Sequence, residues 1–205
     1  MENARLREQL AESYISYTDE EFVREDTVYK QRYDYTEAAI LKNSWSQQNN
    51  YIMINKGLLH GVKPDMAVIS PQGIVGVVVN STTNFSTIMS VLHSDSRNSV
   101  KIKRTNTNGT LVWDGGDYRY ASVVDIPTTH KLYKNDTIVT SGMANDFPEG
   151  IMVGYIESLK LIQGSGFYKV KIRLATDFNK LAHVYIINNR FKEEQDSLMA
   201  ATMAI

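Results

Sequence analysis

A long stretch of short, alternating strands constrains the fold of this chain more than any other sequence feature. From Tyr29 to about Arg190, β-branched and aromatic residues recur with a period of two, and Gly, Asn, Asp, Ser and Pro interrupt them at short intervals. Helical segments do not separate the strands, so the pattern indicates a barrel or sandwich and not βαβ units. The predicted strands are Ala38–Asn43, Tyr51–Asn55, Met66–Ser70, Ile74–Ser81, Ser86–Leu92, Ser99–Arg104, Thr110–Trp113, Ala121–Asp125, Thr137–Thr140, Ile151–Ile156, Tyr168–Arg173 and Val184–Asn188.

Two parts of this region look like copies of each other. Pro64–Ile69 followed by Gly73–Val78 matches Asn135–Thr140 followed by Gly150–Ile156. In both copies an apolar strand leads through a turn into a second strand that contains a glycine. The match predicts two related β units.

Glycines inside these second strands need a physical reason, because a strand glycine loses side-chain packing and costs backbone entropy. We therefore predict that Gly76 and Gly154 mark bulges or tight bends where a small barrel closes on itself. Gly73, Gly142 and Gly150 are predicted to be structural as well.

The segment from Glu2 to about Arg24 has a different composition and residue pattern. It lacks Gly and Pro and is rich in Glu, Arg, Leu and Ala, which predicts a helix. One helical stripe carries the candidate dimerisation residues Leu6, Leu10, Tyr14 and Tyr17. The alternative is a helix that packs on its own domain. The C-terminal end, residues 190–205, is predicted to be a frayed tail or a short helix.

Composition excludes several classes of protein. With 42% apolar and 22% charged residues the chain can build a packed core. Its formal net charge of −1 and its lack of a Lys/Arg block argue against binding to nucleic acid or to an anionic membrane surface. No window is apolar enough for a membrane span, yet the chain begins within a helical pattern, so we expect a further segment before Met1.

An ordered set of segments resembles the rod-shape-determining MreC family. The segments are Glu2–Leu10, Ala38–Ser44, Ile52–Gly57, Gly61–Met66, Gly73–Val78, Asp136–Gly142 and Phe147–Gly154. The resemblance implies an N-terminal α-helix followed by two small six-stranded β-barrels, in a mainly β protein. It also implies a homodimer through the helix and an N-terminal membrane anchor that is absent from this chain.

The same resemblance implies a function without catalysis. Family members are scaffolds of the cell-wall elongation machinery, and they maintain cell shape by organising peptidoglycan synthesis. The implied partners are a penicillin-binding transpeptidase, MreD and RodA, at the periplasmic or extracytoplasmic face of the bacterial inner membrane. No cofactor and no metal are implied.

The strand pattern also sets expected domain boundaries. The helix, or stalk, with its linker is expected over residues 1–34, and the tail over 190–205. One barrel is expected to be discontinuous, from 35–62 and 129–189. The central barrel is expected over 63–128.

A hydrolase is one alternative, since chymotrypsin-like proteases also have two β-barrels and a catalytic triad is recognised by its geometry. Ser141 is the most tempting nucleophile, but its surroundings lack a glycine-rich oxyanion loop. The histidines available as bases are His60, His93, His130 and His183. His93 with Asp95 and Ser96 lacks metal-ligand spacing and is better explained as a polar turn.

A glycan-binding module is the other alternative. Such a module needs exposed aromatic side chains that stack on sugar rings. The candidates are Trp45, Trp113, Tyr118 and Tyr120. Trp113 precedes a turn, where a role on the buried face is equally consistent with its position.

Overall fold

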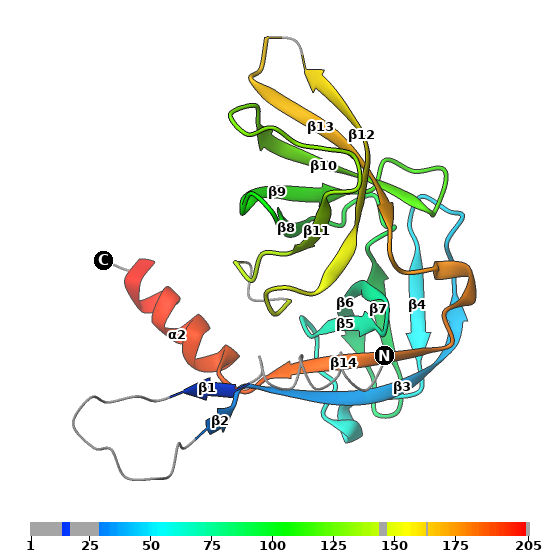
Figure 1. The fold of residues 1–205 in the computed structure, drawn as a ribbon. Helices are drawn as coiled ribbons and strands as arrows, with labels where there is room; N and C mark the ends of the chain where they lie inside the picture. Colours follow the sequence, from blue (N-terminus) through cyan, green and yellow to red (C-terminus); the bar gives the residue numbers. More distant parts are fainter. Residues whose placement is uncertain (1–13, 17–28, 144–146, 163, 204–205) are drawn as a thin grey trace, which may run out of the picture. The chain divides into compact units, whose positions relative to one another are not determined.

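The computed structural model describes residues 14–16, 29–143, 147–162 and 164–203, and strands dominate it (Figure 1). The elements are β1 Tyr14–Ser16, β2 Tyr29–Gln31, β3 Tyr33–Asn43, β4 Tyr51–Ile54, η1 Leu58–His60, β5 Ala67–Ser70, β6 Gly73–Ser81, β7 Ser86–Ser90, β8 Asn98–Ile102, β9 Thr107–Val112, β10 Tyr120–Pro127, β11 Thr137–Thr140, β12 Met152–Ile162, β13 Phe167–Leu174, η2 Phe178–Lys180, β14 His183–Asn189 and α2 Lys192–Met203. Every strand predicted from the sequence has a counterpart among them.

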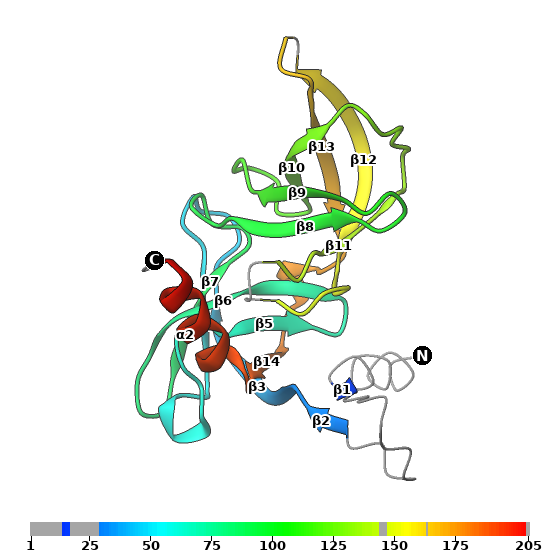
Figure 2. The same ribbon diagram turned by 90° about the vertical axis from the view of Figure 1, so that its left-hand side faces the viewer.

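The strands form two closed six-stranded barrels, as predicted. One barrel has the order β14-β3-β4-β7-β6-β5, and we call it the discontinuous barrel because its strands come from both ends of the region. The other has the order β8-β9-β10-β13-β12-β11 and is called the inserted barrel. Figures 1 and 2 show the inserted barrel in green to orange, between β7 and β14 in the sequence.

The division of strands between the barrels differs from the predicted boundaries. β5, β6 and β7, expected in a central barrel over 63–128, belong to the discontinuous barrel. β11, β12 and β13, expected in the discontinuous barrel, belong to the inserted one. The prediction failed because local alternation reveals a strand but not the distant strand with which it pairs.

The two predicted copies have the same pairing register. Val68 lies opposite Gly76 and Ile138 lies opposite Gly154. One step further along, each pairing skips a residue of the glycine-bearing strand, which is a β-bulge. The predicted bulges at Gly76 and Gly154 are therefore present, and the two barrels repeat one arrangement of strands.

Backbone proximity explains why these two positions are glycines. A Cβ on Gly76 would overlap the carbonyl oxygen of Met89 on β7, and a Cβ on Gly154 would overlap that of Arg173 on β13. Gly73 is restricted in the same way by the carbonyl of Met152. The close approaches at Gly76 and Gly154 lie within the barrel walls, whereas that at Gly73 is between β6 of one barrel and β12 of the other.

The turns that precede the glycine-bearing strands share one hydroxyl contact. Ser70 Oγ accepts a hydrogen bond from the Gly73 N–H at 3.2 Å, and Thr140 Oγ1 accepts one from the Ile151 N–H at 2.9 Å. The second turn is longer. Its Gly142 and Gly150 have φ angles of 76° and 90°, the left-handed region that favours glycine.

Alternation fills both barrel interiors with branched aliphatic side chains. The discontinuous barrel buries Ile52, Ile54, Val68, Ile74, Val78, Ile88, Val184 and Ile186, and the inserted barrel buries Ile102, Leu111, Val123, Ile126, Ile138, Ile156, Val170 and Ile172. Burial of one such side chain stabilises the fold by about 1.5–3 kcal/mol. Each barrel is therefore stabilised by its own apolar core.

Contacts divide the described chain into two compact units. Residues 37–186 form one unit, and the described residues among 1–36 and 187–205 form the other. In the smaller unit, Arg190 donates two hydrogen bonds to the Asp34 carboxylate, at 2.6 and 2.9 Å. The helix α2 in this unit confirms the short helix that was one of the two alternatives predicted for residues 190–205.

The predicted N-terminal helix is wrong where the structure describes it. Tyr14–Ser16 form β1, which pairs antiparallel with β2 at Tyr29–Gln31. Aromatic Tyr14 and β-branched Ile15 favour a strand once a partner is present. Leu6, Leu10 and Tyr17 lie outside the described residues.

The close approach at the bulges predicts a specific loss of stability. Gly76→Ala and Gly154→Ala should each lower the free energy of unfolding by about 2–3 kcal/mol, because the added methyl group forces two strands apart. Urea unfolding followed by circular dichroism measures the change. Gly61→Ala is the control: its Cβ meets nothing within 4 Å, and its φ of 77° costs about 1 kcal/mol. Equal losses in all three variants would contradict the explanation.

Candidate interaction surfaces

An exposed apolar hairpin is the most prominent feature of the inserted barrel. Leu159, Leu161, Ile162 and Phe167 form what we call the apolar tip; the last three are 55%, 42% and 42% exposed. Ile162 lies opposite Phe167, and Leu161 lies one position earlier on β12, so both faces of the hairpin carry apolar side chains. Contiguous exposed apolar surface of this kind marks interaction sites.

The backbone of the tip also has an unpaired edge. β11 pairs with β12 only between Met152 and Tyr155, so among the described strands Ser158–Ile162 pairs with β13 alone. Figures 1 and 2 show β12 and β13 projecting beyond β11. Such an edge can accept an extended segment of another protein.

A second, smaller apolar surface lies on the discontinuous barrel. Leu58, Leu59 and Phe85 are exposed there, and we call them the η1 patch. Backbone hydrogen bonds from Leu58 to Thr82 and from Leu59 to Thr83 hold η1 against the β6–β7 turn. The patch is thus fixed in place.

A polar pocket of about 300 Å³ opens on the inserted barrel. Its lining residues are Asp114, Gly115, Asp117, Tyr120, Ala121 and Lys171. The Lys171 ammonium lies 4.3 Å from the centroid of the Tyr120 ring, a cation–π contact. The turn between β9 and β10 thus faces a lysine of β13 across the pocket.

Both carboxylates of this pocket are held in the ionised form. Hydrogen bonds from Arg119 lower the pKa of Asp117 to about 2. Burial alone would raise the pKa of Asp114, but hydrogen bonds from Ser122 and Lys169 outweigh it and lower that pKa. The Ser122 hydroxyl donates to Asp114 at 2.6 Å, and Lys169 lies 3.0 Å away. At neutral pH the pocket presents two fixed hydrogen-bond acceptors.

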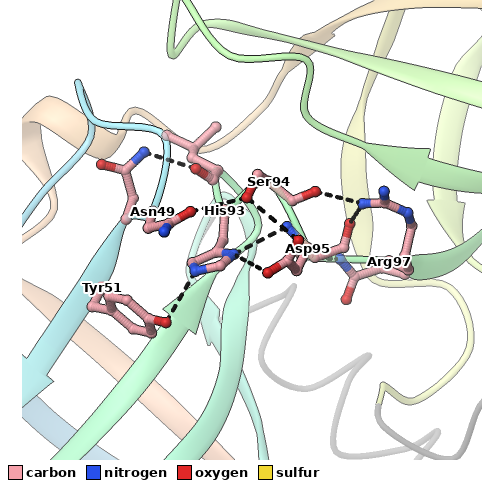
Figure 3. A network of polar contacts seen from close by, with 10 residues as sticks. Asn49, Tyr51, His93, Ser94, Asp95 and Arg97 are labelled. Atoms are coloured by element: carbon pink, nitrogen blue, oxygen red, sulfur yellow. Dashed lines mark hydrogen bonds and ion pairs between the residues drawn. The ribbon is translucent and has the colours of Figure 1, made fainter.

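His93 belongs to a polar network in the connection between the barrels (Figure 3). The Asp95 N–H donates to His93 Nδ1 at 3.0 Å, so Nε2 carries the hydrogen of the neutral ring and donates it to Tyr51 Oη, also at 3.0 Å. The Ser94 hydroxyl donates to Asn49, and Arg97 donates to the Ser94 carbonyl. The network confirms the predicted polar turn and joins it to β4.

The candidate nucleophile and bases of a hydrolase have other partners. The Ser141 hydroxyl donates to Ser99 Oγ at 2.7 Å, and its oxygen accepts from the Met143 N–H. His60 accepts the Gly57 N–H, and His183 lies 3.5 Å from Glu37. These contacts fix turns and strand ends, and they are not the serine–histidine contact that a triad needs.

The structure separates the predicted aromatic candidates. Trp113 is buried, whereas Trp45, Tyr118 and Tyr120 are partly exposed, and only Tyr120 lines the pocket. Within the described residues, no group of three or more His, Asp or Glu side chains could hold a metal ion. The helices in that part of the chain are too short or too polar to cross a membrane.

The sequence does not reveal the residues of the apolar tip or those on the acidic side of the pocket. Leu161, Ile162 and Phe167 lie at the ends of strands, where alternation alone does not tell an exposed face from a buried one. Lys169, Lys171 and Arg173 do alternate with buried residues and could have been recognised as an outward face. Their proximity to Asp114 depends on strand pairing, so it could not have been predicted from the sequence.

Two closed six-stranded barrels that repeat one strand arrangement define a double-barrel β protein. Comparison with known proteins agrees: residues 40–188 match the family described as rod shape-determining protein MreC, barrel core. The chain belongs to the MreC family of cell shape-determining proteins.

Relatives and solved structures support this assignment. The cell shape-determining protein MreC of Listeria monocytogenes is 30% identical over 76% of this chain and 54% of its own length. That of Escherichia coli is 24% identical over 91% of this chain and 46% of its own. The chain therefore spans about half the length of these relatives. A solved MreC structure from L. monocytogenes has a TM-score of 0.72 and 29% identity, covering 92% of this chain and 84% of that one.

The His93 network predicts a graded loss of stability. His93→Ala should lower the free energy of unfolding by about 2–3 kcal/mol, because it leaves a cavity and two unpaired polar groups. Tyr51→Phe removes one hydrogen bond and should cost about 1 kcal/mol. Urea unfolding measures both, with the exposed His183→Ala as control. A His93→Ala variant as stable as the control would show that the network is dispensable.

Proposed function

We propose that this chain is a non-catalytic scaffold that binds a penicillin-binding transpeptidase and thereby organises peptidoglycan synthesis during cell elongation. Membership of the MreC family supports the cell-shape role. A solved complex between the penicillin-binding protein PBP2 and MreC from Helicobacter pylori contains a chain of the same fold, with a TM-score of 0.61 and 16% identity to this one, covering 78% of this chain and 99% of that one. The apolar tip is the observation that carries the proposal for this chain.

The tip has the properties of a protein-binding anchor. Leu161, Ile162 and Phe167 are each about half exposed, so burying the remainder would contribute roughly 1 kcal/mol per side chain. Hydrogen bonds to the free edge of Ser158–Ile162 would add direction and register to this apolar contact. Together these terms suit a specific but reversible complex.

Other parts of the proposal rest on the family resemblance. MreD and RodA are proposed as further partners, and the periplasmic or extracytoplasmic face of the inner membrane as the location. A membrane anchor before Met1 and a homodimer through the N-terminal segment are proposed for the same reason. Since Tyr14 lies in β1, the proposed pairing stripe is reduced to Leu6, Leu10 and Tyr17.

The first test is direct binding to the extracytoplasmic part of the transpeptidase from the same bacterium. Leu161→Glu with Phe167→Glu should raise the Kd at least tenfold, because both changes place charge in the buried contact. Calorimetry or interferometry measures the affinity. Leu58→Glu with Leu59→Glu is the matched control on the η1 patch and should leave the Kd unchanged. The reverse pattern would move the site to that patch, and no binding by the unmodified chain would refute the proposal.

The second test concerns self-association. Leu6→Glu with Leu10→Glu should convert dimer to monomer in analytical ultracentrifugation, since charge in an apolar seam opposes pairing. Leu198→Glu, an exposed change on α2, is the control and should have no effect. An unchanged dimer in the double variant, or a monomeric unmodified chain, would remove the N-terminal segment from the interface.

A further inference from the structure

The outward face of β13 carries a row of cations. Lys169, Lys171 and Arg173 alternate with Val170 and Ile172, which are buried in the barrel. In the described part of the chain, no carboxylate forms an ion pair with Lys171 or Arg173, whereas Lys169 is paired with Asp114. Lys171 and Arg173 thus lie two residues apart on one face of the sheet, and the nearby charges of Glu157 and, for Lys171, of Asp117 act on them.

Tyrosines flank the end of this row. Strand pairing places Tyr120 of β10 and Tyr155 of β12 on either side of Arg173, in one line across the sheet. The Arg173 guanidinium carbon is 5.8 Å from the Tyr155 ring centroid. Lys171, one step along β13, covers the Tyr120 ring and lines the pocket.

These groups point to one class of ligand. The cations of Lys171 and Arg173 suit a carboxylate, whereas the ionised Asp114 and Asp117 accept hydrogen bonds from hydroxyl groups. Exposed edges of Tyr120 and Tyr155 add amphipathic contact surface. A sugar unit that bears a carboxylate combines all of these features, and the pocket is at the small end of ligand-binding cavities, which are roughly 300–1,000 Å³.

An anionic bilayer fits the same surface less well. Binding to such a bilayer is favoured by clusters of unpaired basic residues, and here Asp114 and Asp117 lie among the cations. A sugar unit offers several hydroxyl groups to these acceptors in addition to its one carboxylate, whose charge the cations can neutralise. The cations and hydrogen-bond acceptors of the pocket therefore favour a sugar over a lipid headgroup.

We propose that the pocket between the β9–β10 turn and β13 binds a carboxylate-bearing sugar unit of a glycan. Its carboxylate pairs with Lys171 of the lining, and its hydroxyl groups donate to Asp114 and Asp117. Arg173, two residues further along β13 and outside the lining, adds positive charge. The site is separate from the apolar tip: Phe167 lies four residues from Lys171, roughly 13 Å along the strand. Loss of one activity should leave the other intact.

Amide NMR spectra of the whole chain test the proposal with defined probes. N-acetylmuramic acid and glucuronic acid should shift the signals of Gly115, Tyr120 and Lys171 in a saturable way. N-acetylglucosamine, which lacks a carboxylate, should bind at least tenfold more weakly. Lys171→Met keeps the stem over Tyr120, removes the charge, and should weaken acidic-sugar binding about tenfold.

Lys160→Met is the matched control, because Lys160 lies on the same sheet face opposite Lys169 and outside the pocket lining. It should leave the affinity unchanged. Phosphatidylglycerol vesicles are the competing probe. Absence of saturable shifts with the acidic sugars would overturn the proposal, as would equal effects of both variants or a response to vesicles alone.

Discussion

Closure of the discontinuous barrel by β14 is the constraint on which the rest of this structure depends. β14 lies between β3 and β5 in the strand order, yet it comes last in the chain, after all six strands of the inserted barrel. The first barrel therefore cannot close until the second has been synthesised. In the first barrel, two strands approach closely at Gly76, beside a β-bulge. The same arrangement occurs at Gly154 in the second barrel, so both barrels use the same strand geometry.

Local patterns predicted the strands but not their partners. Alternation located the strands of both barrels, and the glycines pointed to the bulges, because these properties depend on neighbouring residues. The assignment of β5, β6 and β7 was wrong because it depends on the pairing of β7 with β4 and of β5 with β14, which lies more than a hundred residues further along the chain. The segment at Tyr14–Ser16 was assigned to a helix for the same reason, since its strand depends on β2.

The surfaces follow from this architecture. A closed barrel directs much of its apolar surface inward, and the exposed apolar side chains at the end of β12 and β13 are where the proposed protein contact lies. On the outside of the same sheet, β13 brings cations next to the ionised carboxylates of the β9–β10 turn. One strand thus connects a surface suited to a protein with a pocket suited to a charged sugar, while buried polar networks such as that of His93 hold the connection between the barrels.

The order of closure is tested most directly by excising the inserted barrel. Residues 97–175 contain all of its strands, so they should give a dispersed amide NMR spectrum and unfold cooperatively on heating. Residues 63–128 contain strands of both barrels and should give the narrow spectrum of an unfolded chain. A folded 63–128 fragment, or an unfolded 97–175 fragment, would contradict the account of how this protein closes its two barrels.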